Sequence, residues 1–216
     1  RDLWAHQRIY RALHVGVPFL VVMLHGLQAW VPTGMVRVYE WDLAQAGRVY
    51  GWIALLAGSG GVLAGPTLAR LFEARGVDDS PIRIAVIGAS GACISLALLP
   101  LQADAYAGLV CVALASFFVP LPLALITTAM QFVTPNDMRG VVAGMYVVTN
   151  NVLGLALGPT MVAATTDYVF GDPKAVAQSL GLVSLIMGPL SVGILLIGRK
   201  AYVARARELR GVAAAA

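Results

Sequence analysis

AGLVCVALASFFVPLPLALITTAMQFV, residues 107–133, carries no formal charge over more than the ~20 residues that a helix needs to cross the hydrocarbon core of a membrane. Lipid offers no partner to a bare N–H or C=O, so a continuous apolar run can span it only as a helix. We count six such stretches, at about 13–36, 48–69, 82–101, 107–133, 141–165 and 178–198. The sequence therefore predicts an all-α, polytopic membrane protein with six transmembrane helices.

The composition of the 216 residues agrees with this interpretation. Hydrophobic residues make up 59% of the chain and charged residues 12%, whereas a soluble domain carries about 25% charged residues. The mean hydropathy is +0.79. Both cysteines, Cys93 and Cys111, fall inside predicted spans, which supports neither a disulfide framework nor a cysteine-based zinc site. We predict no metal, no cofactor and no catalytic residue.

The basic residues are divided unevenly between the two sides of the predicted membrane. Twelve lie on the side of the N-terminus, and only Arg37, Arg48 and Lys174 lie on the other. Cytoplasmic loops carry the excess of Lys and Arg, so both termini are predicted to be cytoplasmic. The net charge of +4 then reflects ends that face anionic lipid headgroups, and no nucleic-acid partner is expected. The predicted organisation is a cytoplasmic segment at 1–12, a six-helix bundle at 13–198 and a cytoplasmic tail at 199–216.

Two prolines interrupt the fourth span. Pro120 and Pro122 each lack the N–H that a helix interior needs, so the helix should bend or break there. Thr127, Thr128 and Gln131 follow within the same span, and transporters build binding sites at discontinuous helices of this kind. An ordinary proline kink within a bundle is the alternative.

Polar residues in the first span fall on one predicted face. His25, Gln28 and Pro32 are spaced three and four residues apart, which places them on the same side of a helix. An ionisable group at membrane depth is a functional hypothesis by default. The alternative is a neutral histidine that hydrogen-bonds to a neighbouring helix.

Two adjacent amides stand in the middle of the fifth span, within YVVTNNVLGLALGP at residues 146–159. On a helical projection Asn150 shares a face with Tyr146, and Asn151 points about 100° away. Asn151 falls within a stripe of glycines, Gly140, Gly144, Gly154 and Gly158. We therefore predict that Asn151 bonds to another helix where small residues allow close approach, and that Asn150 lines a cavity. A bond from Asn150 to a polar residue of another neighbour is the alternative.

Glycines at two further places predict packing faces. In the second span Gly61 and Gly65 lie four residues apart, the spacing at which helix backbones approach closely. In the third span Gly88, Ser90 and Gly91 form a Gly-Ala-Ser-Gly sequence that could instead suggest a rhomboid-like intramembrane serine protease. Such an enzyme needs a general base, but all three histidines precede Ser90, whereas the rhomboid pattern has its histidine on a later span. Packing is therefore the favoured interpretation.

The stretch TPNDMRGVVAGMYVVTNNVLGLALGP, residues 134–159, resembles the loop between spans ten and eleven of a major facilitator superfamily transporter and the helix that follows it. In that family the loop carries Pro, Arg and Gly, here Pro135, Arg139 and Gly140, before a helix that ends in Gly-Pro. Residues 27–47 and 166–180 are similar to bacterial spinster-like members. One departure is the pattern after the second span, where GPTLARLFEARG, residues 65–76, lacks the usual acidic residue.

The resemblance implies half of a twelve-helix fold, spans seven to twelve, in which residues 1–12 end the linker between the halves. It further implies a non-enzymatic secondary transporter of the bacterial cytoplasmic membrane, which moves a small organic or lipid-like solute by alternating access. The expected partners are an N-terminal six-helix half, membrane lipid and a small-molecule substrate. A rhomboid-like protease and a structural membrane subunit are the alternatives. The residues expected to line the substrate pathway are His25, Gln28, Gln131, Tyr146 and Asn150, and those expected in helix packing or gating are Pro120, Pro122, Arg139, Asn151, Gly154 and Gly158.

Overall fold

The computed structural model describes residues 7–215, and over this range the chain is helical and without strands. In chain order the elements are α2 (Gln7–Tyr39), α3 (Leu43–Ile53), η1 (Ala54–Gly58), α4 (Ser59–Ala74), α5 (Ser80–Leu98), η2 (Leu99–Leu101), α6 (Ala105–Phe118), α7 (Leu123–Val133), α8 (Arg139–Ala164), η3 (Thr165–Phe170) and α9 (Val176–Ala215). Elements η1 and η3 are π-helical, and η2 is a short 3-10 turn.

Six stretches within the described residues are long and apolar enough to cross a membrane, which confirms the prediction of six transmembrane helices. They are Ile9–Tyr39, Leu43–Ala74, Ser80–Leu101, Ala105–Val133, Arg139–Phe170 and Val176–Leu209. Each is longer than the apolar run that predicted it, because a helix continues past the hydrocarbon for as long as its residues favour it. Helix α2 begins at Gln7, so residues 7–12 of the segment predicted at 1–12 belong to it, and residues 1–6 lie outside the described part. Residues 199–215 of the predicted tail are helical and form the end of α9.

The resemblance implied that the helix of the fifth span ends at its Gly-Pro pair, but it continues beyond that pair. Helix α8 runs through Pro159 to Ala164, and the π-helical turn η3 continues to Phe170. Gly171 then adopts a left-handed conformation with φ of 62° and ends the span. A single internal proline removes one N–H, and helices packed in a membrane tolerate that loss.

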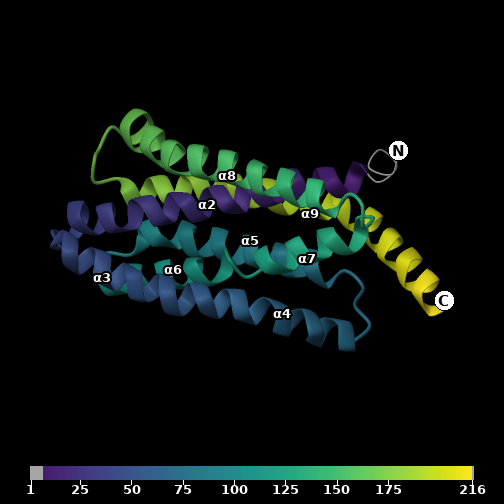
Figure 1. Cartoon of the computed structure of the whole chain (residues 1–216). Coiled ribbons are helices and arrows are strands. Elements are labelled where there is room, and N and C mark those ends of the chain that lie inside the picture. The colour runs from purple at the N-terminus through teal and green to yellow at the C-terminus, as the bar shows by residue number, and fades with distance from the viewer. Residues whose placement is uncertain (1–6, 216) are drawn as a thin grey trace.

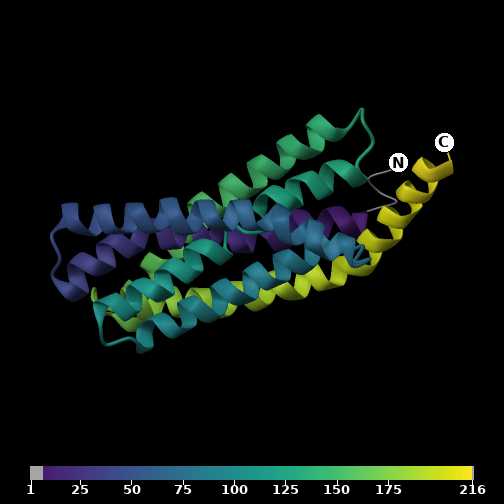
Figure 2. The same cartoon turned by 90° about the horizontal axis from the view of Figure 1, so that it is seen from below.

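The helices form an elongated antiparallel bundle in which α2 is the central element (Figure 1). Helix α2 packs against α8 on one side and α9 on another, and α5 packs against α9 and α6. The beginning of α2 and the end of α9 lie at the same end of the bundle, and the last turns of α9 extend beyond the other helices (Figure 2). This placement agrees with an even number of membrane crossings.

Burial is distributed unevenly among the spans. The most apolar window of the first span is 61% buried, whereas the windows of the second and fifth spans are 17% and 22% buried. Large hydrophobic side chains therefore stand exposed on both, Leu56 and Leu63 on the second and Val148 and Val152 on the fifth among them. These two spans form the flanks of the bundle.

A buried carboxylate joins α5 and α9 at the end of the bundle where α2 begins. Asp79 is 3% exposed and accepts a hydrogen bond from Arg83 Nε at 2.8 Å and another from Arg199 of α9. Burial alone would raise the pKa of Asp79, but the hydrogen bonds and positive charges of Arg199 and Arg83 hold that pKa below its ordinary value. A second ion pair, between Asp78 and Arg207 at 2.7 Å, joins the same loop to α9.

The opposite end is held by Arg37 and Trp30 of α2. Arg37 Nη1 donates to the carbonyl of Pro173 at 3.3 Å, and its guanidinium lies 5.4 Å from the centre of the Trp30 ring. Trp30 Nε1 in turn donates to the carbonyl of Pro159 in α8 at 2.9 Å. Tryptophan commonly occupies the membrane interface, where its ring is apolar and its N–H can bond.

Candidate functional site

The fourth span is broken at the two prolines, as the sequence predicts. Helix α6 ends at Phe118 and α7 begins at Leu123, with Pro120 and Pro122 between them. Neither proline can donate an N–H, so the carbonyls of Ser116 and Phe118, four residues earlier, lose their helical donors. The chain turns through the gap by a bond from Leu123 N to the Pro120 carbonyl at 3.1 Å.

Glycines of α4 accommodate this broken span. A Cβ added at Gly61 would collide with the carbonyl of Phe117, and one added at Gly65 with the carbonyl of Leu121. The packing face predicted for the second span is thus confirmed, and it packs against the broken part of the fourth span, at 117–121.

Glycines of α5 do the same from another side. A Cβ at Gly88 would lie 2.7 Å from the Phe118 carbonyl, and one at Gly91 would lie 2.5 Å from the Phe118 ring. The Gly-Ala-Ser-Gly sequence is therefore part of a packing face, the interpretation that the sequence favoured.

An open cavity of about 490 Å³ lies between α2, the η1–α4 segment and α6. This volume falls within the range of about 300–1,000 Å³ that small-molecule sites occupy. Its lining residues are Leu24, Gln28, Tyr50, Ala54, Gly58, Ser59, Val62, Leu63, Ser116 and Pro120. Gln28 and Pro120 were predicted from the sequence as pathway and packing or gating residues.

The other polar groups of this cavity, Tyr50, Ser59 and Ser116, were not predicted from the sequence. A signal for one of them was present, because Ser116 stands four residues before Pro120, where the proline must release a carbonyl. For the π-helical turn η1 no comparable signal exists in its sequence, ALLAG.

Helix α8 meets α2 along a row of residues spaced by four, Val142, Tyr146, Asn150, Gly154, Gly158 and Val162. A Cβ added at Gly154 would lie 2.5 Å from Val21 Cγ1, and one at Gly158 would lie 2.6 Å from the Val22 carbonyl oxygen. The predicted packing role of Gly154 and Gly158 thus agrees with their positions against α2.

The positions of the two amides differ from the prediction. Asn150, 8% exposed, lies in the row that meets α2 and donates to the Tyr146 carbonyl at 3.0 Å. Asn151 is exposed and donates to the Val147 carbonyl at 2.8 Å, so it forms this bond within its own helix. Gly140 and Gly144 have no atom of the described residues within 4 Å of an added Cβ. A helical projection defines faces that run parallel to the helix axis. Helix α2 instead contacts α8 along its row of residues four apart, and this row is inclined to the axis of α8.

His25 and Gln28 also point to different places. His25 is half-buried against α8, where its Nδ1 lies 3.2 Å from a Cβ added at Gly154, and this nitrogen pairs with the Val21 carbonyl at 3.0 Å. Gln28, one turn later, lies in the cavity between α2, α4 and α6. Only Gln28 of the two faces that cavity.

Gln131 lies near the end of α7, and Arg139, the first residue of α8, reaches back to it. Arg139 Nε donates to the carbonyls of Gln131 at 2.9 Å and Thr134 at 3.2 Å, so its positive charge caps the end of the helix. Tyr146 lies close by and lines a small space between α7 and α8 with both residues. The five predicted pathway residues thus fall in three places, and their contact with a solute stays a prediction.

A buried polar cluster that the sequence analysis did not place in the pathway extends from Tyr146 along α2. The rings of His14 and Tyr146 meet edge to face with centres 5.9 Å apart, and His14 Nδ1 pairs with the Tyr10 carbonyl at 3.0 Å. The hydroxyl of Tyr10 lies 3.1 Å from that of Thr134. The available signal was that His14 is an ionisable residue at the start of the predicted first span.

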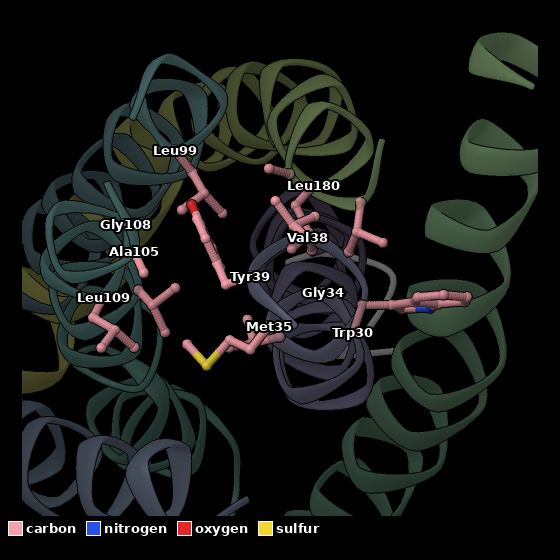
Figure 3. Close-up of a pocket in the computed structure, with 14 residues that line it drawn as sticks. Trp30, Gly34, Met35, Val38, Tyr39, Leu99, Ala105, Gly108, Leu109 and Leu180 are labelled. Atoms are coloured by element: carbon pink, nitrogen blue, oxygen red, sulfur yellow. The ribbon is translucent and has the colours of Figure 1, made fainter. Parts of the chain in front are cut away.

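A third space, of about 50 Å³, lies at the Tyr39 end of α2 between α6 and α9 (Figure 3). Met35 and Tyr39 extend into it toward Leu109 and Leu99. This volume is well below that of known ligand sites, and the lining is almost entirely apolar. We regard it as a packing defect.

The antiparallel spans, the broken fourth helix and the open cavity beside it are the features of a polytopic, all-helical integral membrane protein. A family model described as Major Facilitator Superfamily matches residues 1–159, and the chain belongs to that transporter family. Among solved structures the fold is similar to that of a bacterial homolog of the human lysosomal transporter Spinster, in an inward-facing and unoccupied conformation. The two share 16% identity with a TM-score of 0.65, over 96% of this chain and 49% of that one. No curated protein sequence gives a match.

Proposed function

We propose that this chain is the C-terminal half, spans seven to twelve, of a secondary active transporter that moves a small organic or lipid-like solute by alternating access. The observation that carries the proposal is the match of nearly the whole chain to about half of a solved transporter. Transporters of this kind consist of two repeats around a site near the membrane midplane. In this proposal the N-terminal half is the principal partner, and the solute passes between the two.

The exposed flanks of the bundle support such a partner. The second and fifth spans are the least buried, and the fifth carries the exposed amide of Asn151 among apolar side chains. A polar amide facing lipid costs free energy, whereas one facing another helix can bond. We propose that part of this surface contacts the N-terminal half, which rocks against it.

The proposed location is a bacterial cytoplasmic membrane with both termini inside. The division of basic residues, twelve against three, supports this orientation. The start of α2 and the end of α9 lie at one end, together with Arg83, Arg199 and Arg207. Arg37 lies at the other end.

Within this half, Gln28 is the predicted pathway residue that lies in the open cavity, and His25, Tyr146 and Asn150 lie on or near the α2–α8 contact. Untargeted metabolite profiling of cells with and without the full-length protein would identify a solute, and uptake of that solute into vesicles would then test the mechanism. We expect Gln28→Leu to lower uptake at least about fivefold, the value of one lost hydrogen bond. An exposed polar residue away from the cavity, Thr160→Val, is the control. Unchanged uptake in Gln28→Leu would contradict the assignment.

A further inference from the structure

The cavity between α2, the η1–α4 segment and α6 lies where two irregular stretches of backbone meet. On one wall Pro120 leaves the Ser116 carbonyl without its helical donor, and on the other the π-helical turn η1 presents Gly58. A Cβ at Gly58 would lie 3.8 Å from the Ser116 carbonyl oxygen. Single π-helical turns are frequent at functional sites, and non-helical backbone at membrane depth is tolerated where it lines a cavity.

The hydroxyl of Ser116 distinguishes this wall from ordinary packing. Ser116 is 4% exposed, and among the residues that the structure describes nothing forms a hydrogen bond with its Oγ. A serine in a helix usually donates to the carbonyl one turn earlier. Ser95 of α5, equally buried, does so to Gly91 at 2.7 Å. A buried hydroxyl left without a partner is costly, so Ser116 is a group for which a ligand would supply a partner.

The charges around the cavity define the kind of ligand. None of the lining residues is Asp, Glu, Lys, Arg or His. A charged group placed here would lose its hydration without gaining a counter-charge, which is strongly unfavourable in a membrane interior. A hydroxyl or carboxamide would instead pair with Ser116, and Leu24 and Val62 would contact an apolar remainder.

We propose that this cavity binds an uncharged, hydrogen-bonding group of the ligand, with Ser116 as its buried polar contact and Gln28 as a second polar contact. The identification of this ligand with the transported solute rests on the proposed function. The binding of an uncharged group at Ser116 is independent of that function, because binding requires no transport.

Photolabelling of the full-length protein in membranes tests the proposal with a defined probe, 3-azioctanol, an alcohol that carries a photoactivatable diazirine. The matching diazirine carboxylate and ammonium compounds are the charged comparators, and labelling is normalised to a lipid-exposed peptide of α8. We expect 3-azioctanol to label α4 and α6 peptides around Val62 and Ser116 saturably, and at least about tenfold more than either charged compound. Ser116→Ala should reduce this labelling about 5- to 10-fold, the effect of one hydrogen bond.

Ser95→Ala is the matched control, since it removes an equally buried hydroxyl that already has a partner outside the cavity. Its labelling should equal that of the unmodified protein. Equal labelling by a charged compound, or no difference between Ser116→Ala and Ser95→Ala, would overturn the proposal. Saturable, Ser116-dependent labelling of a protein that transports nothing would uphold the site and refute the proposed function. Transport by a protein that shows no such labelling would uphold the proposed function and refute the site.

Discussion

The contact between α8 and α2 predicts opposite effects for two glycines of one helix. A Cβ added at Gly158 would lie 2.6 Å from the Val22 carbonyl oxygen, 2.9 Å from Gly26 N and 3.0 Å from His25 Cβ. Two of these atoms are backbone and cannot rotate away, so Gly158→Ala must separate the helices. Gly144→Ala meets no described atom within 4 Å.

Overpacking costs about 1–3 kcal/mol, and a backbone collision belongs at the upper end. Replacing glycine by alanine within a helix stabilises that helix by about 1 kcal/mol. Gly158→Ala should therefore destabilise the protein by about 2 kcal/mol, and Gly144→Ala should stabilise it by up to about 1 kcal/mol. At about 2–4 °C per kcal/mol for a unit of this size, Tm should fall by about 4–8 °C in the first variant and rise slightly in the second.

A thiol-reactive fluorescent dye measures this Tm in detergent, because unfolding exposes the buried Cys111. Equal melting temperatures for the two alanine variants would refute the α2–α8 packing described above. A fall in Gly144→Ala alone would show that α8 presents the face that the helical projection had predicted.

Three further predictions concern the ends of the bundle and the amide of Asn151. Asp79 has a lowered pKa when folded, so its contribution to stability is present above the ordinary carboxyl value of 3.8 and is lost as the pH falls through the folded value. Asp79→Asn should lower the free energy of unfolding by about 2 kcal/mol at neutral pH and should remove the loss of stability in acid. Measurements of Tm against pH test this, and an unchanged pH profile would contradict the pairing with Arg199. Asn151→Leu should change stability by no more than about 0.6 kcal/mol, the average value of one interhelical bond in a membrane, because within this half the side chain is exposed; a loss of about 2 kcal/mol or more would show that Asn151 is packed between helices of this half. Arg139→Ala should lower Tm by about 2–4 °C by uncapping α7, whereas Arg139→Lys should restore only part of that loss, since one Nε donates to two carbonyls.

The sequence determined the features that depend on one segment at a time. Six spans follow from six apolar runs, because lipid forces each run to satisfy its own backbone. The break at Pro120 and Pro122 follows from two missing N–H groups, whatever packs nearby. The glycines of the second and third spans also predicted close approach correctly, because small residues at helical spacing serve few other purposes in a membrane.

Only the tertiary structure decided which helix meets which face. Asn150 and Asn151 are adjacent and chemically identical, and their placement depends on α2 crossing α8 along an inclined row rather than along the axis. Likewise Ser116 is unremarkable in the sequence until α2, η1 and α6 form an open cavity that it lines, without giving its hydroxyl a partner among the described residues. A long apolar run predicts that a helix lies in the membrane. Because lipid and protein are equally apolar neighbours, the pattern alone cannot distinguish a face packed against protein from one exposed to lipid.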